Sequence, residues 1–396
     1  MWRLSVWSPP LSPLEELHMT DPHVAGSFAA PAAPSRPTAV VLCEGNFGQI
    51  DGKTANGLIR HSERYEILSV IDSRLAGRDS GQVLDGVPNG IPIHPDLSAA
   101  LQHAGPGIPD YLIVGVAPTS GMLSPEERNV ILLAMSRGLN VVNGLHEFLN
   151  DDAEFVAAGA LRGVDIIDIR RPRAKRDLRM FTGQIAEVSC PRLAVLGTDG
   201  AIGKRTTATI LTRALNDRGV HAVLIGTGQT SIIQGARYGI ALDAIPTQFV
   251  TGELEATIVE AFEAEHPDVI IVEGQGALSH PTYLSSTAIL RGSLPVGVIL
   301  QHAPARMTVS DYPAVAMPTV TSEIKLIETF AATRVIGLTI NHEDMTDQDV
   351  TAAIGHYERE LGIPCTDALT RPTERLLDMV FSALPALEPD ISLSAR

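Results

Sequence analysis

Residues 193–207 read LAVLGTDGAIGKRTT, and this stretch decides the fold of the second half of the chain. Four apolar residues predict a short buried strand, a glycine-rich turn follows, and residues 208–218 are typical of a helix. This arrangement binds phosphate, because backbone N–H groups converge on the anion and the helix dipole adds positive potential. We therefore predict a phosphate-binding loop with contacts from Gly197, Thr198, Gly200, Gly203, Lys204, Arg205, Thr206 and Thr207.

The loop departs from the usual pattern G-x-x-x-x-G-K-[S/T] at two positions. Five residues separate Gly197 from Gly203, and Arg205 stands where a hydroxyl that ligates Mg²⁺ is expected. Thr206 follows, but one step along a helix rotates a side chain by about 100°. A metal site formed by Thr206 and Glu273 is therefore expected only if the ligand is ATP with Mg²⁺.

Length and composition bound the class of protein. A chain of 396 residues with 44% hydrophobic residues is long enough for two ordinary domains with buried cores. An excess of 46 acidic over 30 basic residues gives a net charge of −16, which excludes a general attraction to nucleic acid or anionic lipid. The three cysteines lack metal-ligand spacing, and no apolar stretch approaches the roughly 20 residues that span a bilayer. We expect a cytoplasmic homo-oligomer that acts on a small molecule.

The chain divides into four parts. Residues 1–36 are rich in Pro, Ala and Ser and are expected to form a disordered leader. Residues 37–180 alternate short apolar strands with amphipathic helices, which predicts a Rossmann-like domain with a parallel sheet. The expected strands are 39–43, 65–71, 91–93, 111–116 and 140–142, and the expected helices are 53–61, 97–103 and 125–137.

A second series begins after a charged boundary segment at 173–190 and extends from 190 to 386, with a tail at 387–396. Its expected strands are 193–196, 222–225, 269–272, 296–300 and 335–339, its expected helices are near 253–265, 321–331 and 373–383, and residues 226–235 are expected to form a loop. The predicted fold class is therefore α/β, with two doubly wound, mainly parallel sheets: a Rossmann-like N-terminal domain and a P-loop NTPase-like C-terminal domain.

Glu273 ends an apolar strand within VIIVEGQG, residues 269–276, where open α/β sheets place ligands. A carboxylate beside a phosphate loop either holds Mg²⁺ or acts as a general base. Asp199, inside the loop, is either a metal or amine contact or an acid at the start of a helix. His302 follows another strand and is a third candidate for catalysis, against the alternative of an ordinary surface histidine.

Four residues are candidates for substrate binding: Gln229, Thr230, Gln275 and Arg306. The first two belong to GTGQTS, residues 226–231, whose hydroxyls and amide suit a small polar ligand, although a plain Ser/Thr-rich turn explains them too. Arg306 could present its guanidinium to a carboxylate substrate. Residues 143–146 and 168–172 also end strand-like runs that can face a domain cleft, although a structural role is favoured for any one of them.

The phosphate loop and the Glu273 motif resemble dethiobiotin synthetase and the cobyric-acid amidotransferases. Over most of residues 39–385 the chain more closely resembles a bacterial family known as a domain of unknown function, with a Rossmann-like N-terminal domain and a dethiobiotin-synthetase-like C-terminal domain. The matching stretches are 51–55, 114–118, 144–146, 197–207, 252–255 and 273–276. One branch of that family comprises D-glutamate N-acetyltransferases, which transfer acetyl from acetyl-CoA to the amino group of a D-amino acid.

Three functions follow from these observations. In the first, an N-acyltransferase, the loop binds the phosphates of acetyl-CoA or CoA and Glu273 or His302 deprotonates an amino acid; Arg205 favours this reading because it adds positive charge where a Mg²⁺-dependent enzyme needs a hydroxyl. In the second, an ATP- and Mg²⁺-dependent ligase or kinase, Lys204 contacts the β/γ-phosphates and Glu273 the metal. The third is a non-catalytic nucleotide-binding sensor.

Overall fold

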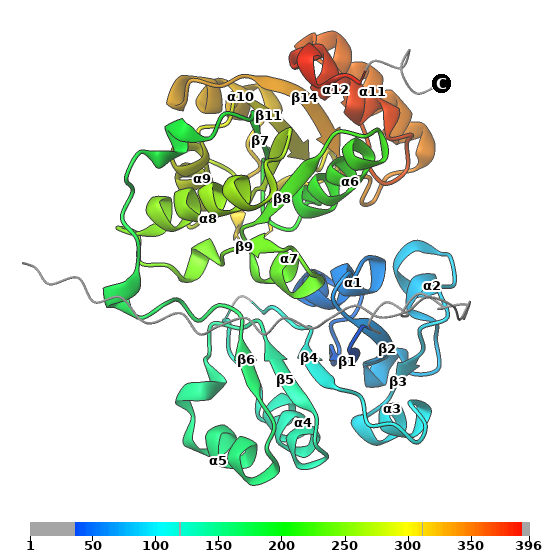
Figure 1. Ribbon diagram of the computed structural model, residues 1–396. Helices are drawn as coiled ribbons and strands as arrows, with labels where there is room; N and C mark the ends of the chain where they lie inside the picture. The colour runs from blue at the N-terminus through cyan, green and yellow to red at the C-terminus, as the bar shows by residue number, and fades with distance from the viewer. Residues whose placement is uncertain (1–35, 119, 311, 390–396) are drawn as a thin grey trace, which may run out of the picture. The chain divides into compact units, whose positions relative to one another are not determined.

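The computed structural model describes residues 36–389 except Thr119 and Asp311. Two parallel sheets, each packed with helices, follow one another along the chain (Figure 1). The α/β fold class predicted from the sequence is confirmed. Residues 1–35 of the predicted leader and 390–396 of the predicted tail lie outside the described residues. Among the helices of the described part of the chain, none combines the length and the apolar character needed to cross a bilayer.

The first sheet has the strand order β3-β2-β1-β4-β5-β6, which is the order of a Rossmann-type domain. Its strands are β1 (Thr38–Leu42), β2 (Glu66–Ile71), β3 (Ile93–His94), β4 (Tyr111–Val114), β5 (Asn140–Asn143) and β6 (Ile166–Asp168). Its helices are α1 (Lys53–Arg60), α2 (Ser80–Asp85), α3 (Leu97–His103), α4 (Pro125–Ser136) and α5 (Ala153–Arg162).

Local chemistry fixes several of these boundaries. The α4 helix begins at a capping box, in which Ser124 and Glu127 satisfy each other's backbone N–H groups, with Pro125 in the first turn. Within the first domain, the helices α2 and α5 and the strand β6 were not predicted. Only two residues of α5 are buried, Phe155 and Gly159, so its apolar period is weak.

The second sheet has the order β15-β14-β11-β7-β10-β8-β9, again all parallel. Its strands are β7 (Arg192–Gly197), β8 (Ala222–Gly226), β9 (Tyr238–Gly239), β10 (Val269–Glu273), β11 (Gly297–His302), β14 (Val335–Ile340) and β15 (Cys365–Thr366). Its helices are α6 (Lys204–Asp217), α7 (Gln229–Gln234), α8 (Val250–Glu265), α9 (Ser285–Ser293), α10 (Val320–Phe330), α11 (Asp347–Leu361) and α12 (Glu374–Ala383). A separate antiparallel hairpin joins β12 (Thr308–Val309) to β13 (Tyr312–Ala316).

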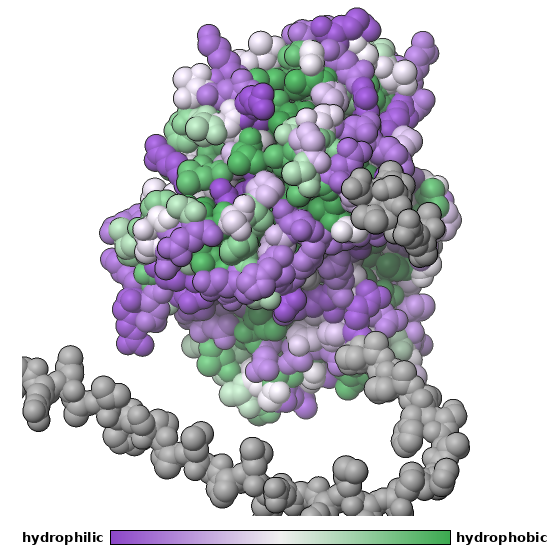
Figure 2. All heavy atoms as spheres, turned by 45° about the horizontal axis from the view of Figure 1, so that its top comes forward, coloured by the Kyte–Doolittle hydropathy of each residue, from purple (hydrophilic) through white to green (hydrophobic). Residues whose placement is uncertain are grey.

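The alternation of side chains along β7 builds two cores. Leu193 and Val195 face α6 and α12, whereas Ala194 and Leu196 face α8, α9 and α10. The central strands are therefore buried on both faces, as expected for a parallel sheet. On the face drawn in Figure 2, hydrophilic residues surround several separate groups of hydrophobic ones.

Helices α1 and α7 join the first domain to the second. The hydroxyls of Thr54 and Thr230 are 3.0 Å apart, and Ile233 of α7 belongs to the hydrophobic core of the first domain. Gln234 donates from Nε2 to the carbonyls of Gly57 (2.6 Å) and His61 (2.7 Å) at the end of α1. Residues that follow the strands of both sheets are thereby held facing one another.

Candidate functional site

A cavity of about 590 Å³ lies at the carboxyl ends of both sheets. The first domain contributes residues that follow β1, β4 and β5, among them Lys53 and His146. The second contributes the whole of 200–207 together with residues after β8, β10, β14 and β15. Ligands of open α/β sheets bind at this edge, so the cavity is the candidate site.

The phosphate loop forms the floor of this cavity as the sequence predicts, with the α6 helix beginning directly at Lys204. Gly203 has φ 103°, and Ala201 has φ 47°, a left-handed value that non-glycine residues seldom adopt. No described residue accepts a hydrogen bond from the backbone N–H groups of 201–206. Six donors and a helix N-terminus therefore face a space that an anion can fill.

Lys204 is buried, and its ammonium donates to the backbone carbonyl of Asp199 within the same loop. Burial lowers the pKa of Lys204 to about 8, a shift that the Asp199 and Glu273 carboxylates oppose. The side chain is therefore mainly protonated at neutral pH. It supplies a positive charge beneath the loop.

Arg205 extends toward the first domain: its Nη1 donates to Gln234 Oε1, and its guanidinium approaches Gly57. Burial lowers the pKa of Arg205, while the Glu273 carboxylate raises it. Of the two threonines that follow, Thr206 lines the cavity and is half-buried, whereas Thr207 is buried and donates to Gln301 Oε1 (2.6 Å). The hydroxyl of Thr207 is therefore already used inside the sheet.

Glu273 lies at the end of β10 and lines the cavity. Its Oε2 accepts from the N–H groups of Thr227 (2.9 Å) and Gly228 (3.3 Å), while Oε1 has no hydrogen bond to any described residue. Burial raises the pKa of Glu273, although Arg205 and the two N–H groups oppose that rise. A carboxylate with a raised pKa and one uncommitted oxygen at a cavity is suited to accept a proton. Gln275, which also lines the cavity, donates to the Thr227 carbonyl.

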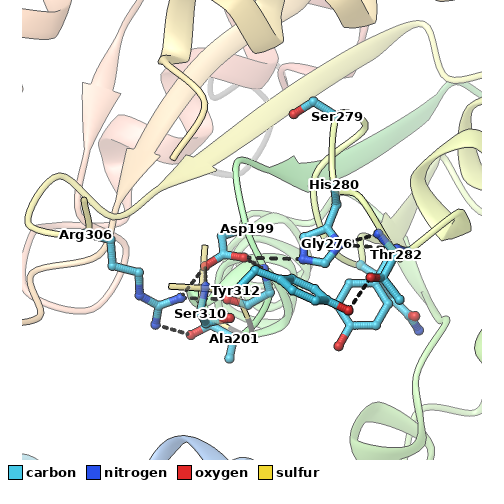
Figure 3. A network of polar contacts seen from close by, with 12 residues as sticks. Asp199, Ala201, Gly276, Ser279, His280, Thr282, Arg306, Ser310 and Tyr312 are labelled. Atoms are coloured by element: carbon cyan, nitrogen blue, oxygen red, sulfur yellow. Dashed lines mark hydrogen bonds and ion pairs between the residues drawn. The ribbon is translucent and has the colours of Figure 1, made fainter. Parts of the chain in front are cut away.

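The structure places His302 and Asp199 away from the cavity. His302 is buried beneath the loop with Nδ1 2.8 Å from Thr198 Oγ1, and burial lowers its pKa to about 4. Asp199 is fully buried and accepts from Arg306 (2.8 Å) and from the N–H of Ser310 (2.9 Å). Figure 3 shows Arg306 reaching Asp199 from one side and His280 lying on the other. Neither candidate lines the cavity.

Residues 226–235 were predicted as a loop, and this is wrong for 229–234, which form α7. The α7 helix has only six residues, between Gly228 and Gly235, whose φ is 119°. Four of the six residues are polar, so the sequence shows no apolar period that would predict a helix. Gln229 Oε1 accepts from Arg170 (2.8 Å), and Thr230 contacts Thr54. Both side chains line the cavity, but each also joins the two domains.

Sequence reasoning missed a group of contacts made by Arg170 in the wall of the cavity. Arg170 is buried and donates to Asp243 (2.8 Å), to Gln229 and to the carbonyl of Gly144. His146 lies beside it, with Nε2 3.7 Å from Asp243 Oδ2, and burial followed by Arg170 lowers its pKa. The sequence did indicate that residues 143–146 and 168–172 follow strands, which is where cavity-lining residues of such sheets lie.

His342 and Asp367 form a second polar pair that lines the cavity. The Nδ1 of His342 is 2.6 Å from Asp367 Oδ2, and the two residues follow β14 and β15. Both line the cavity. They are 25 residues apart in the chain, so no local pattern brings them together.

Comparison with known proteins agrees with this architecture. Residues 179–377 match a family described as "Domain of unknown function (DUF1611_C) P-loop domain", and residues 73–172 match "Domain of unknown function (DUF1611_N) Rossmann-like domain". A crystal structure of a DUF1611 family protein from Anabaena variabilis is 30% identical, with a TM-score of 0.80, and the match covers 88% of this chain and 100% of that one.

Two curated relatives carry the name D-glutamate N-acetyltransferase. The protein from Tritonibacter scottomollicae is 28% identical over 274 residues, which are 67% of this chain and 80% of that protein. The protein from Pseudoalteromonas sp is 28% identical over 263 residues, 65% of this chain and 77% of that protein. The resemblance seen in the sequence is therefore confirmed.

Proposed function

The chain belongs to the DUF1611 family, and on that premise we propose that it is an N-acetyltransferase that moves acetyl from acetyl-CoA to the amino group of a small amino acid. The names of the two curated relatives support the reaction class and make D-glutamate the first acceptor to test. The phosphate loop would hold the phosphates of the donor.

The observation that carries this proposal is the loop itself. The backbone N–H groups of 201–206 have no acceptor among the described residues, and the Lys204 ammonium lies beneath them. Donors left without partners at the edge of a cavity need an anion or water. The pyrophosphate of CoA supplies two phosphates in series, which match a row of N–H groups better than a single carboxylate does.

The chemistry that the cavity must support is one acyl transfer. The amine nitrogen attacks the thioester carbonyl carbon, the new C–N bond forms, and the C–S bond breaks with release of CoA as the thiol. The amine proton has to leave, and Glu273 is a carboxylate at the cavity with one uncommitted oxygen and a pKa that burial raises. We assign Glu273 as the general base, and not His302, because His302 does not line the cavity and its Nδ1 lies 2.8 Å from Thr198 Oγ1.

The first domain supplies the wall that would face the acceptor. Burial, then Arg170 and more weakly Lys53, lower the pKa of His146 while Asp243 raises it, and the two cations place positive charge near this part of the cavity. Positive potential favours the carboxylate groups of an amino acid. The amino group would then lie between this wall and Glu273.

Thermal unfolding with acetyl-CoA, CoA, ADP and ATP/Mg²⁺ tests the donor, because a ligand that binds the native state alone raises stability by RT ln(1+[L]/Kd). We expect stabilisation by acetyl-CoA and CoA, and release of free thiol when D-glutamate is added. EDTA should leave this release unchanged. Turnover of ATP that EDTA abolishes and Mg²⁺ restores would establish the ligase or kinase alternative, and donor binding without turnover of any amino acid would favour a sensor.

A further inference from the structure

We propose that Arg306 and Asp199 form a positioning pair that holds the phosphate loop in its anion-binding shape before the donor arrives. The proposal rests on the proposed function for the identity of the anion, which is the phosphate part of CoA. It differs from what the sequence suggests for these residues, namely substrate binding for Arg306 and catalysis for Asp199.

All five N–H donors of the Arg306 guanidinium are used within the protein. The Nη1 group donates to Asp199 Oδ2 (2.8 Å) and to the carbonyl of Gly200 (2.9 Å). The Nη2 group donates to the carbonyl of Ala201 (3.2 Å) and to Glu343 Oε2 (3.0 Å), and Nε donates to Glu343 Oε1 (2.5 Å). No donor is left for a substrate carboxylate.

These contacts determine where the loop amides point. In a trans peptide the C=O and N–H bonds point in opposite directions. Because Arg306 binds the carbonyls of Gly200 and Ala201, the N–H groups of Ala201 and Ile202 point away from it. These are two of the loop N–H groups without an acceptor among the described residues.

Asp199 completes the arrangement from the other side. Its carboxylate accepts from the N–H of Gly200 (2.7 Å), the N–H of Ser310 (2.9 Å) and Arg306, and its backbone carbonyl accepts from Lys204. The β12–β13 hairpin is thereby attached to the loop through Ser310, as Figure 3 shows. The left-handed backbone of Ala201 is held between these contacts, so strain at this residue is offset by its neighbours.

A phosphate loop that is ordered before the donor binds affects the affinity for the donor. A loop that is already ordered loses less conformational freedom when the phosphates bind, so the donor binds more tightly. Because its N–H donors are all used within the protein, Arg306 acts through the loop and not on the reacting atoms. Removal of the guanidinium should therefore raise the KM for acetyl-CoA and leave kcat nearly unchanged, because the lost interaction serves donor binding equally in the ground and transition states.

The test uses Arg306→Gln, Arg306→Lys and Asp199→Asn in the full chain, with acetyl-transfer kinetics and calorimetric binding of CoA and of inorganic pyrophosphate. For Arg306→Gln we expect the KM for acetyl-CoA and the Kd for both probes to rise by about 10- to 100-fold, with kcat within about threefold. Arg306→Lys should recover only part of the loss, because an ammonium cannot reproduce the fork. Asp199→Asn should show the same split between KM and kcat.

The matched control is Arg192→Gln. Arg192 also anchors carbonyls, those of Val188 (2.8 Å), Cys190 (2.9 Å) and Ser293 (2.7 Å), but at the opposite end of β7. The Arg192→Gln variant should have a lower melting temperature but the same KM for acetyl-CoA and the same Kd for pyrophosphate as the wild type.

Three results would overturn the proposal: unchanged probe affinity in a folded Arg306→Gln, a rise confined to the KM of the amino acid, or a large fall in kcat for Asp199→Asn. Pyrophosphate binding needs no acetyl transfer, so a wild type that binds it but never acetylates an amine would refute the proposed function while leaving the positioning pair standing.

Discussion

Gly57 and Arg205 pack against each other so closely that a methyl group on Gly57 would lie 2.5 Å from Arg205 Nη2. The contact joins α1 of the first domain to the start of α6 in the second, next to the phosphate loop. The residue that replaces the usual metal-binding hydroxyl thus contacts the other domain.

Gly57→Ala should destabilise the protein by about 1 kcal/mol, because the added methyl displaces the Arg205 guanidinium from Gln234 and the higher helix propensity of Ala offsets part of that loss. Thermal unfolding measures this, with Gly107→Ala as the control, since no atom lies within 4 Å of a methyl group there. Adding Arg205→Ala should relieve the clash, so the two effects should not be additive. An unchanged melting temperature in Gly57→Ala would contradict the close packing.

Lys204→Met should keep the packing of the stem and remove the charge, so the fold should persist while CoA binding weakens by about 10- to 100-fold. The wild-type affinity should fall as pH rises through about 8, because Lys204, with its pKa lowered to about 8, loses its proton over that range. Calorimetry from pH 6.5 to 9.5 measures both effects. A Lys204→Met protein with the same alkaline fall would assign that fall to another group.

Glu273→Gln should lower kcat by about 100-fold or more while CoA still binds, because the amide cannot accept the amine proton. In the wild type, kcat/KM should rise with pH through the Glu273 pKa, which burial raises. Single-turnover kinetics with acetyl-CoA and D-glutamate separate the chemical step from binding. A kcat within about threefold of wild type would make Glu273 structural.

In Arg205→Gln, the rise of kcat/KM with pH that reports the Glu273 pKa (the acid limb of the pH profile) should move to higher pH. Arg205 opposes the rise in the pKa of Glu273, so loss of its charge lets that pKa rise further. Arg205→Lys keeps the charge and is the control, for which the limb should return toward the wild-type position. If the limb stays in place in Arg205→Gln, either Glu273 is not the titrating base or Arg205 is not coupled to it.

His302→Gln should leave kcat within about threefold and make the protein more resistant to acid. Between its usual pKa of 6.5 and the folded value of about 4, the unfolded chain takes up a proton that the folded protein refuses, so stability falls as pH falls. Protonation of His302 in the unfolded chain should lower the free energy of unfolding by about 1–3 kcal/mol over this pH range, and His302→Gln should not show this decrease. Urea unfolding at pH 4.5 and 7 measures the difference, and a large drop in kcat would restore His302 as a base.

The sequence identifies the phosphate loop because its elements are consecutive: an apolar strand, glycines and a lysine at a helix start need no distant partner. The α11 helix was missed for the opposite reason, since Val350 is its one buried residue among fifteen and the apolar period is faint. Small and polar residues likewise conceal α7 and α9.

The candidate site was harder to predict than the fold. Glu273 and His302 both end strands and both are buried, so the same local pattern selects both, and only packing shows that Glu273 lines the cavity and His302 does not. The Arg170 contacts involve partners 59 and 73 residues away. Arg306 likewise reaches Asp199 across 107 residues, and such pairings depend on how the strands are ordered in the sheet.

The segment that connects the two sheets determines where the chain can accept inserted residues. The second half of this connection is held to α8, where Glu253 binds Arg179 and Glu255 binds the backbone of Thr182 and Ile185. Residues 173–177 are exposed and make fewer contacts, chiefly the 3-10 turn at Lys175–Asp177. The α1–α7 contacts, and not the length of the connecting segment, therefore determine how the two halves of the cavity are positioned relative to each other. Extra residues inserted at 173–177 would form a surface bulge and leave the cavity walls in place.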